Sequence, residues 1–453
     1  MVAVSGTLMR GVSGVRGLVG SDLTPAVIAR YARAFGVLCG THGRVVVLGR
    51  DSRASGKEYA AAAAAALQAL GMDVVSCGIV PTPTVQLAVE HHRAAGGIVI
   101  TASHNPIEWN ALKFIGEDGL FLDRDRARQL FALADGPPAP DHPPRGTLVE
   151  DTTAIARHVD GVLRVPYVDG AAVRARQLTV ALDCVRGVGG AIMPLLLDRL
   201  GCRIIGMDLE TDGQFPREPE PIPANLGALS QLVRSSGADL GMAVDPDGDR
   251  LALVDETGGP IGEDYTLAFA VRTVLERRVG PVVVNLSTSL VVDDAAKPFG
   301  AMVVRVPVGE AHVARGLRER GAVVGGEGNG GVMLPSFHLG RDAPLAAALV
   351  LDLVARSGRS VSGLVAGQPR YVIVKAKMKY ANRLDEIYQQ LESALDAPGV
   401  DRQDGLRFAW SGRWLHVRPS GTEPVIRLIA EAPDARDAQE LIERARATLD
   451  GRS

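Results

Sequence analysis

The feature that most constrains the fold is a regular alternation of strand-like and helix-like runs, which begins near the N-terminus. Apolar strand-like runs at 44–49, 73–79 and 97–101 alternate with helix-like runs at 57–70 and 84–93. Short apolar strands separated by helices form mostly parallel sheets that are covered on both faces. The segment therefore predicts a β-α-β-α-β unit.

The same alternation returns twice after a proline-rich stretch at 136–144, which cannot continue a helix and indicates a surface linker. The second round consists of strand 177–183, helix 189–200, strand 202–207, helix 225–235 and strand 240–244. The third consists of helix 264–277, strand 281–286, helix 290–299, strand 302–306, helix 311–320 and strand 322–324. Three successive α/β modules are expected.

The C-terminal part of the chain has a different order of elements. It is predicted to contain strand 370–379, helix 384–395, a hairpin of strands 406–410 and 414–417, strand 425–430 and helix 435–449. This order is typical of a separate α+β domain. The fold class expected is thus α/β, with three modules of mixed, mostly parallel sheets and a C-terminal α+β domain. The expected boundaries are 1–150, 151–256, 257–368 and 369–453.

Composition excludes some classes of partner. The net charge is −3 with no basic tail, so nucleic acid is not an expected partner. No apolar run reaches the roughly 20 residues of a membrane helix, and the four cysteines lack C-x-x-C spacing. We expect a cytoplasmic protein without a membrane partner, either a monomer or a homodimer.

The hexapeptide DPDGDR at 245–250 places three carboxylates at alternate positions between two apolar segments. Asp245, Asp247 and Asp249 repel one another unless a cation neutralises them, and hard oxygen ligands suit Mg²⁺. A calcium EF-hand loop is disfavoured because its sixth position is Arg250 rather than glycine, although Glu256 stands at the twelfth. A solvated acidic turn remains the simple alternative.

Ser103 lies in the hexapeptide TASHNP at 101–106, directly after an apolar strand-like run. Ligands of open α/β sheets bind beyond the carboxyl ends of the strands, so the serine is a candidate nucleophile. An ordinary turn is an equal alternative from spacing alone. The adjacent His104 is expected to point away from the serine, and no G-x-S-x-G motif is present, which disfavours a Ser-His-Asp hydrolase.

Two further loops offer groups that bind sugars and phosphates. The glycine-rich run GGEGNGG at 325–331 allows close backbone approach, and Glu327 and Asn329 offer partners for sugar hydroxyls. The heptapeptide RPSGTEP at 418–424, with Arg427 beyond it, supplies amides, hydroxyls and guanidinium groups for a phosphate. Each run is also compatible with a plain turn.

In combination and in this order, the motifs make the chain resemble the α-D-phosphohexomutases along essentially its whole length. TASHNP resembles the phosphoserine loop of that family, DPDGDR its metal loop and RPSGTEP its phosphate loop. GEGNGG corresponds to the sugar loop, usually Gly-Glu-x-Ser-Gly-His, but Asn329 replaces the serine and Gly331 the histidine. This variant, like Gly421 in the phosphate loop, is similar to archaeal-type phosphoglucosamine mutases and related bacterial proteins. His338 is a candidate replacement for the missing histidine.

The resemblance implies an isomerase of carbohydrate metabolism that moves phosphate between O6 and O1 of a hexose. The expected hexose is glucosamine, which places the enzyme in amino sugar biosynthesis. It implies a phosphorylated Ser103, and Mg²⁺ held by a phosphoserine oxygen and the side chains of Asp245, Asp247 and Asp249. Glucose or glucosamine 1,6-bisphosphate would be the intermediate and activator. Arg250 would stabilise the transferring group.

The same resemblance implies roles for residues outside these loops. Lys113, in the tetrapeptide NALK at 110–113, is the general acid/base candidate, with an exposed surface lysine as the alternative. The substrate-binding set, placed around a central cleft, comprises Arg16, His104, Glu327, Asn329, Arg418, Ser420, Gly421, Thr422 and Arg427. The C-terminal domain is expected to move as a lid about a hinge near 367–371.

Two other functions remain open at this stage. One is a mutase that acts on glucose or mannose phosphates. The other is a non-catalytic sugar-phosphate binding protein of the same fold.

Overall fold

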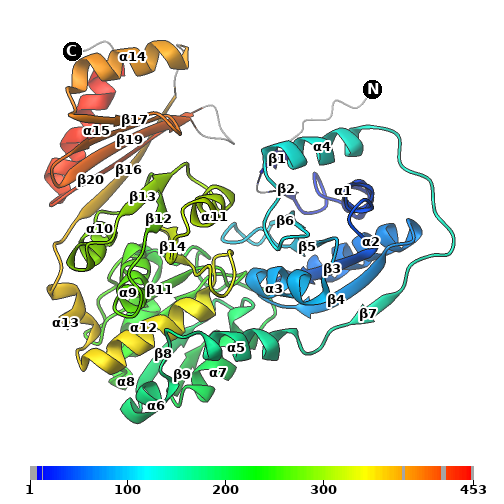
Figure 1. Ribbon diagram of the computed structural model, residues 1–453, viewed down its shortest axis with the longest axis horizontal. Helices are drawn as coiled ribbons and strands as arrows, with labels where there is room; N and C mark the ends of the chain where they lie inside the picture. Colours follow the sequence, from blue (N-terminus) through cyan, green and yellow to red (C-terminus); the bar gives the residue numbers. More distant parts are fainter. Residues whose placement is uncertain (1–7, 13, 380–382, 420–424, 450–453) are drawn as a thin grey trace.

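The computed structural model describes residues 8–12, 14–379, 383–419 and 425–449, which form four successive sheets with their helices. Figure 1 shows the N-terminal unit in blue and cyan, two central units in green and yellow, and the C-terminal unit in orange and red. The predicted architecture of three α/β modules followed by an α+β domain is confirmed.

The first unit is a seven-stranded mixed sheet in the order β1-β2-β6-β5-β3-β4-β7. Its strands are β1 (Met9–Gly11), β2 (Gly14–Leu18), β3 (Val45–Arg50), β4 (Asp73–Ile79), β5 (Gly96–Ile100), β6 (Trp109–Gly116) and β7 (Leu148–Glu150). Its helices are α1 (Pro25–Cys39), α2 (Gly56–Ala69), α3 (Thr82–His92) and α4 (Arg124–Asp135). The central strand β5 is buried along its whole length, as expected for a sheet covered on both faces.

The second unit contains a four-stranded sheet in the order β11-β10-β8-β9, of which only β11 is antiparallel to its neighbour. Its elements are α5 (Ala154–Arg164), α6 (Gly170–Arg176), β8 (Thr179–Asp183), α7 (Gly189–Arg199), β9 (Arg203–Met207), η1 (Pro223–Asn225), α8 (Gly227–Ser236), β10 (Leu240–Val244) and β11 (Leu251–Val254). The turn between β10 and β11 carries the three aspartates.

The third unit repeats this plan in the order β13-β12-β14-β15. Its elements are α9 (Asp264–Leu275), β12 (Val282–Asn285), α10 (Val291–Ala296), η2 (Lys297–Phe299), β13 (Val303–Val306), α11 (Glu310–Glu319), β14 (Val324–Glu327), β15 (Gly331–Met333), α12 (Ala343–Ser357) and α13 (Val361–Ala366). Helix α12 is buried on almost every side, and one apolar core joins the second and third units through it. The two units are therefore packed as one block.

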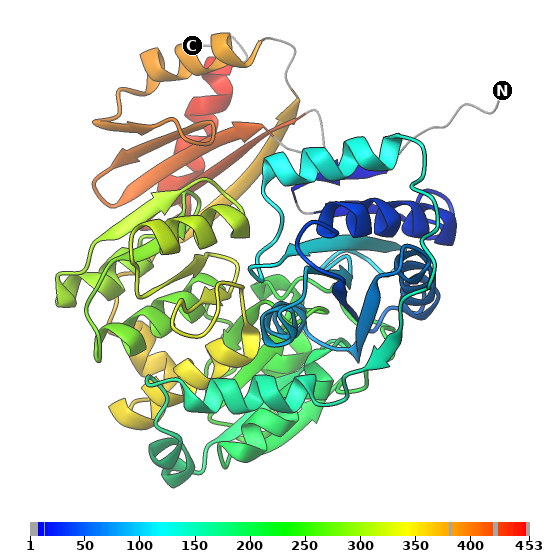
Figure 2. The ribbon, with the colours of Figure 1, turned by 45° about the vertical axis from the view of Figure 1, so that its right-hand side comes forward.

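The fourth unit is an antiparallel sheet in the order β16-β20-β19-β18-β17 with two helices on one face. Its elements are β16 (Val372–Lys379), α14 (Leu384–Leu395), β17 (Gly399–Asp401), β18 (Leu406–Trp410), β19 (Arg413–Pro419), β20 (Val425–Ala432) and α15 (Ala435–Leu449). Alternate residues such as Phe408, Val417 and Leu428 point into a core of its own. Figure 2 shows this unit as a separate body above the green and yellow units.

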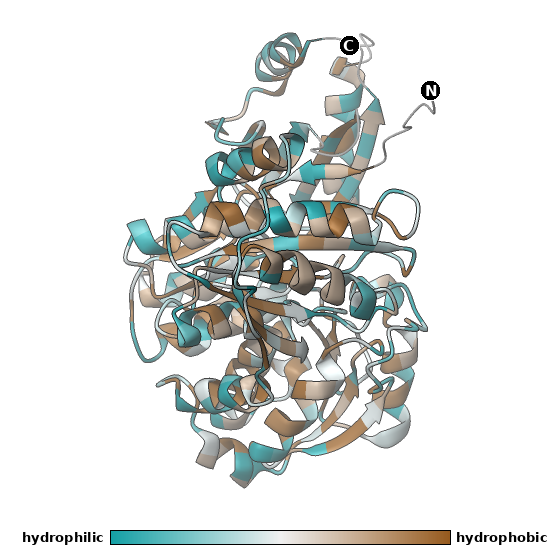
Figure 3. Ribbon diagram, turned by 90° about the vertical axis from the view of Figure 1, so that its right-hand side faces the viewer, coloured by the Kyte–Doolittle hydropathy of each residue, from teal (hydrophilic) through white to brown (hydrophobic). Residues whose placement is uncertain are grey.

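Apolar residues lie where the layers meet. In Figure 3 the strands inside the layers are mostly brown, whereas the helices that cover them carry both brown and teal. Among the residues that the structure describes, no helix is both long and apolar enough to span a bilayer.

Candidate active site

Ser103 lies just beyond the carboxyl end of β5, with its side chain buried and turned toward the second unit. Its φ of +50° is in the left-handed region that residues other than glycine rarely adopt. In this conformation Oγ donates to Asp245 Oδ2 over 3.1 Å. Two segments 142 residues apart, one with the candidate nucleophile and one with the acidic loop, therefore meet.

His104 does not point away from Ser103 as expected. Its Nδ1 lies 3.3 Å from Ser103 Oγ, within hydrogen-bond distance. The unusual backbone of Ser103 explains the difference, because neighbouring side chains diverge only when the chain between them is regular. Arg250, and burial in addition, hold the pKa of His104 well below its usual range. The imidazole is thus neutral at neutral pH.

A buried arginine that the sequence analysis missed holds the serine loop in shape. Arg53 donates from Nη2 to the carbonyl of Ser103 over 2.8 Å and from Nη1 to the carbonyl of Pro106 over 2.7 Å. Asp51 pairs with its Nε at 3.0 Å. Arg16 binds the loop from the other side, from Nη1 to Asn105 Oδ1 over 2.7 Å. The only sequence signal for Arg53 is its position shortly after the predicted strand 44–49.

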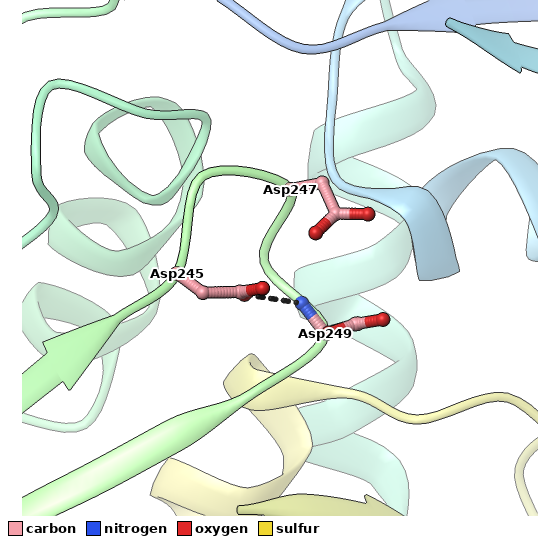
Figure 4. Close-up of side chains that lie close together, drawn as sticks. All are labelled: Asp245, Asp247 and Asp249. Carbon is pink, nitrogen blue, oxygen red and sulfur yellow. Dashed lines mark hydrogen bonds between the residues drawn. The ribbon is translucent and has the colours of Figure 1, made fainter. Parts of the chain in front are cut away.

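The three aspartates of the acidic loop are completely buried, which excludes the solvated acidic turn. Their carboxylates gather in the turn between β10 and β11 (Figure 4), and one oxygen of each lies within 4.8 Å of the others. Asp245 Oδ1 accepts from the amide of Asp249 over 3.1 Å, which closes the turn. Oδ1 of Asp247 and Oδ1 of Asp249 have no hydrogen-bond partner among the described residues.

This donor set fits a hard divalent cation. Burial raises the pKa of Asp245 well above its usual range, and the neighbouring Asp249 and Asp247 add to the shift. Such mutual repulsion is relieved when a cation binds, and buried carboxylate oxygens without partners supply the ligands that Mg²⁺ prefers. The residues present are therefore compatible with a magnesium ion.

Lys113 is not an exposed surface lysine. Its side chain, on β6, is buried, and Nζ donates to Asp247 Oδ2 over 2.7 Å. Thr82, at the start of α3, donates from Oγ1 to the same oxygen over 2.7 Å. Burial alone would raise the pKa of Asp247, but Lys113 and Thr82 outweigh it and hold that pKa below its usual range. Thr82 was not predicted as a site residue.

Arg250 follows the aspartates directly and is itself nearly buried. Its Nε lies 3.6 Å from Asp249 Oδ1 and its Nη1 lies 3.5 Å from Glu220 Oε1. The guanidinium therefore faces the same small volume as the aspartates and His104.

The glycine-rich run is shorter as a loop than expected. Glu327 is the last residue of β14 and Gly331 the first of β15, so only 328–330 connect the strands. Glu327 accepts from Asn285 Nδ2 over 2.9 Å, from the amide of Gly309 over 3.0 Å and from Arg341 over 2.7 Å. Asn329 is half-buried, and its Oδ1 accepts from the amide of Gly331 over 3.3 Å.

His338 does not replace the histidine missing at Gly331. Its Nε2 lies 2.8 Å from Asp342 Oδ2 and its Nδ1 accepts from the amide of Gly340 over 3.1 Å. His158 binds the same Asp342 oxygen over 2.7 Å. Both ring nitrogens of His338 are thus used inside the protein.

The predicted phosphate loop is described only at its edges. Ser420, Gly421 and Thr422 lie outside the described residues. Arg418 on β19 and Arg427 on β20 are direct cross-strand neighbours, and Lys377 on β16 is the next neighbour of Arg427. Three cationic residues therefore stand side by side across neighbouring strands. Asp404 pairs with Arg418 Nε at 3.0 Å.

Fold and site together define an enzyme of the α-D-phosphohexomutase class, with a serine hydroxyl beside a buried acidic triad in a four-domain chain. Family models bear this out for all four units. The models of phosphoglucomutase/phosphomannomutase domains I, II and III match residues 7–137, 156–259 and 262–371, and the model of the C-terminal domain matches 371–448. The chain belongs to the phosphoglucomutase/phosphomannomutase family.

Similar proteins span the whole chain. A protein of Methanopyrus kandleri named "Probable phosphoglucosamine mutase" is 39% identical over 437 residues, 95% of each chain. A phosphoglucomutase/phosphomannomutase of Thermococcus kodakarensis is 37% identical over 96% of each chain. The crystal structure of a family member from Burkholderia thailandensis superposes with a TM-score of 0.87 at 27% identity, covering 100% of this chain and 98% of that one.

Proposed function

We propose that the protein is a phosphoglucosamine mutase, which interconverts glucosamine 6-phosphate and glucosamine 1-phosphate. The observation that carries the proposal is the 3.1 Å hydrogen bond from Ser103 Oγ to Asp245, which puts a hydroxyl able to carry phosphate beside a cation site. The relative from Methanopyrus kandleri, by its name, supports glucosamine as the sugar.

The proposed cycle begins with phosphate on Ser103 Oγ. A hydroxyl oxygen of the sugar phosphate forms a bond to that phosphorus while the phosphorus–Oγ bond breaks, and the hydroxyl proton passes to Lys113 in its neutral amine form. The product is glucosamine 1,6-bisphosphate. After this intermediate turns over, Ser103 Oγ takes the other phosphoryl group and the sugar oxygen regains a proton. Atoms and charge balance over the cycle, because the second transfer restores the phosphoryl group to Ser103 and a proton to the sugar oxygen.

Positioning and electrostatics supply most of the catalysis in phosphoryl transfer. Magnesium held by Asp245, Asp247, Asp249 and a phosphoserine oxygen would neutralise charge on the transferring group. Arg250 stabilises the same charge from the side, since its guanidinium faces the triad. His104, neutral and 3.3 Å from Ser103 Oγ, and Arg16 of β2, which binds the same loop, are proposed to contact the end of the substrate that reacts with Ser103.

The far end of the substrate requires separate recognition. Glu327 and Asn329 are proposed to bind sugar hydroxyls. The row of Arg418, Arg427 and Lys377 supports binding of the phosphate that does not react. Ser420, Gly421 and Thr422 are proposed to complete that phosphate site.

The functional test is a comparison of three substrates with Mg²⁺ and glucose 1,6-bisphosphate as activator. A higher kcat/KM for glucosamine 6-phosphate than for glucose 1-phosphate or mannose 1-phosphate supports the proposal. A preference for either of the others favours the second candidate, a phosphoglucomutase/phosphomannomutase, which the name of the Thermococcus kodakarensis relative supports.

Ser103→Ala tests the mechanism itself. We expect mutase activity to disappear, and mass spectrometry to find a phosphoserine at position 103 in the wild type alone. Full activity in this variant refutes the mechanism. A wild type with neither phosphate nor turnover indicates the non-catalytic sugar-phosphate binding protein instead.

The setting of the enzyme is part of the same proposal. Cys39, Cys77, Cys184 and Cys202 are all free thiols, which fits a reducing compartment such as the cytoplasm.

A further inference from the structure

Arg341 is a buried cation between three carboxylates that come from two different units. It lies just before α12, and its guanidinium binds Asp249 Oδ2 over 2.5 Å, Glu327 Oε2 over 2.7 Å and Glu310 Oε2 over 3.0 Å. Each of its three nitrogens thus has its own carboxylate. Burial alone would lower the pKa of Arg341, but the three carboxylates raise it well above its usual range.

Two of these three partners belong to the proposed active site. Asp249 is a proposed metal ligand and Glu327 a proposed sugar-binding residue, so one guanidinium touches both functions. Because Asp249 Oδ2 is engaged by Arg341, its Oδ1, which has no hydrogen-bond partner among the described residues, is the oxygen left for a cation. A planar guanidinium with fixed donors is suited to orient several carboxylates at once.

The third partner extends the cluster to the first unit. Gln86 on α3 donates from Nε2 to Glu310 Oε1 over 3.2 Å. Residues of the first three units are therefore joined through Glu310 and Arg341. Arg341 neutralises only part of the local charge, since three carboxylates surround it.

Gly331 is a glycine for a reason that involves Arg341. A Cβ placed on Gly331 would lie 2.3 Å from Arg341 Cδ and 2.8 Å from its Cγ, far inside van der Waals contact. No side chain, and no histidine in particular, fits at position 331 while Arg341 is in place. The two residues are thus alternatives for the same space.

We propose that Arg341 is the positioning residue that sets the metal loop against the sugar loop, in the space that a side chain at position 331 would otherwise fill. The proposal rests on the proposed function for the identity of the two loops. It adds that the geometry of Asp249 and Glu327 depends on one shared guanidinium, and that Gly331 is required to make room for it.

The first test moves Arg341 without removing its charge. Gly331→Ala is expected to lower kcat/KM for the preferred sugar phosphate about tenfold or more, mostly through KM, because the arginine must shift away from Glu327. The matched control is Gly227→Ala, since a Cβ at Gly227 meets nothing within 4 Å. A Gly331→Ala variant with kcat/KM within twofold of the wild type overturns the proposal.

The second test separates charge from geometry. Arg341→Met removes a cation that touches a metal ligand, so Mn²⁺ should bind more tightly, about fivefold by calorimetry, while kcat falls about a hundredfold. Arg341→Lys keeps the charge but loses the planar guanidinium that binds three carboxylates at once. Mn²⁺ affinity should therefore stay near that of the wild type while kcat remains reduced. General loss of structure would weaken both properties together.

The control for this pair is Arg277→Met. Arg277 makes a two-point ion pair with the buried Asp352 in the third unit, away from the aspartate loop. The Arg277→Met substitution should lower the melting temperature without changing the affinity for Mn²⁺. If Arg341→Met also changes only the melting temperature, Arg341 is a structural ion pair and the proposal is wrong.

Failure of this inference and failure of the proposed function have different signatures. A wild type without hexose phosphate turnover contradicts the proposed function, yet the Mn²⁺ comparison still decides whether Arg341 acts on Asp249. Normal turnover with unchanged Mn²⁺ affinity and kinetics in the Arg341 variants contradicts only the inference.

Discussion

Lys113 Nζ donates to Asp247 Oδ2 over 2.7 Å, and both side chains are buried although they come from different units. The pair joins β6 of the first unit to the turn after β10 of the second. Removing one member of a buried ion pair leaves the other without a partner, so loss of either side chain is expected to destabilise the fold. Its position beside the candidate nucleophile makes it a direct target for experiment.

Lys113→Met should lower kcat about a hundredfold or more, because the proposed proton carrier is lost. The variant should also unfold at a lower temperature, since the buried carboxyl of Asp247 loses its main partner. Stopped assays of hexose phosphate conversion and thermal unfolding measure the two effects. Lys57→Met, on the exposed face of α2, is the control and should change neither. Undiminished kcat in Lys113→Met removes the lysine from the mechanism.

Chelation of divalent cations should destabilise the protein as well as stop turnover. The carboxylates of Asp245, Asp247 and Asp249 repel one another when no cation is bound, and Mg²⁺ at the proposed site would bind only the folded arrangement. Thermal unfolding in EDTA and in excess Mg²⁺ should differ by several degrees for the wild type and by much less for Asp249→Asn. Asp125→Asn, an exposed change on α4, should retain the full difference. Equal shifts in both variants would place the cation elsewhere.

The stability of the protein should fall as the pH rises toward 8, in part because of Asp264. Burial raises the pKa of this carboxyl, at the start of α9, to about 8. The unfolded value is about 3.9, so the folded state holds the proton more tightly and stability is lost between about pH 4 and pH 8. Denaturant unfolding of Asp264→Asn should depend less on pH by a few kcal/mol. Parallel pH profiles for the variant and the wild type would contradict the assignment.

Arg427→Met should weaken substrate binding without weakening the fold. Arg427 stands between Arg418 and Lys377 in the sheet register, so its removal takes one cation from the proposed phosphate site without opening the apolar core. KM should rise about tenfold, with a melting temperature equal to or above that of the wild type. Arg436→Met, exposed on α15, provides the control. An unchanged KM would argue against a phosphate at this row.

The fourth unit is expected to rotate about a hinge near 367–371 when glucose 1,6-bisphosphate binds. Among the described residues, its contacts with the third unit include single hydrogen bonds, for example His416 Nδ1 to Ser287 Oγ at 2.8 Å and Tyr371 to Asp294 Oδ2 at 2.8 Å. Such contacts can break and re-form at low cost. Solution scattering should show a smaller radius of gyration with glucose 1,6-bisphosphate than with unphosphorylated glucosamine. Identical profiles would argue strongly against a lid.

The parts of the fold that the sequence predicts best are those that depend on local pattern. Strand β4 and helix α14 have the predicted bounds, because their apolar periodicity is bordered by residues that end an element. The sequence predicts a loop over 325–331, because glycine has a low strand propensity. In the structure 324–327 is strand β14, because pairing with β12 and β15 supplies its hydrogen bonds.

The site shows the same division between local and distant information. Ser103 and the aspartates stand in recognisable motifs, so they could be predicted. Arg53 and Arg341 could not, since their roles arise from partners 50 to 53 residues away for Arg53 and 14 to 92 residues away for Arg341. The positive φ of Ser103 also sets the direction of His104, and no pattern in the sequence predicts that backbone angle.

The partners of the aspartate loop have a consequence for the newly made chain. Thr82 and Lys113 are synthesised before the loop, but Arg341 follows Asp249 by 92 residues. While the ribosome adds those residues, the acidic turn has its first two partners and lacks the third. The nascent protein can therefore form its first sheet early, but the acidic turn reaches its final geometry only when the third unit has been made.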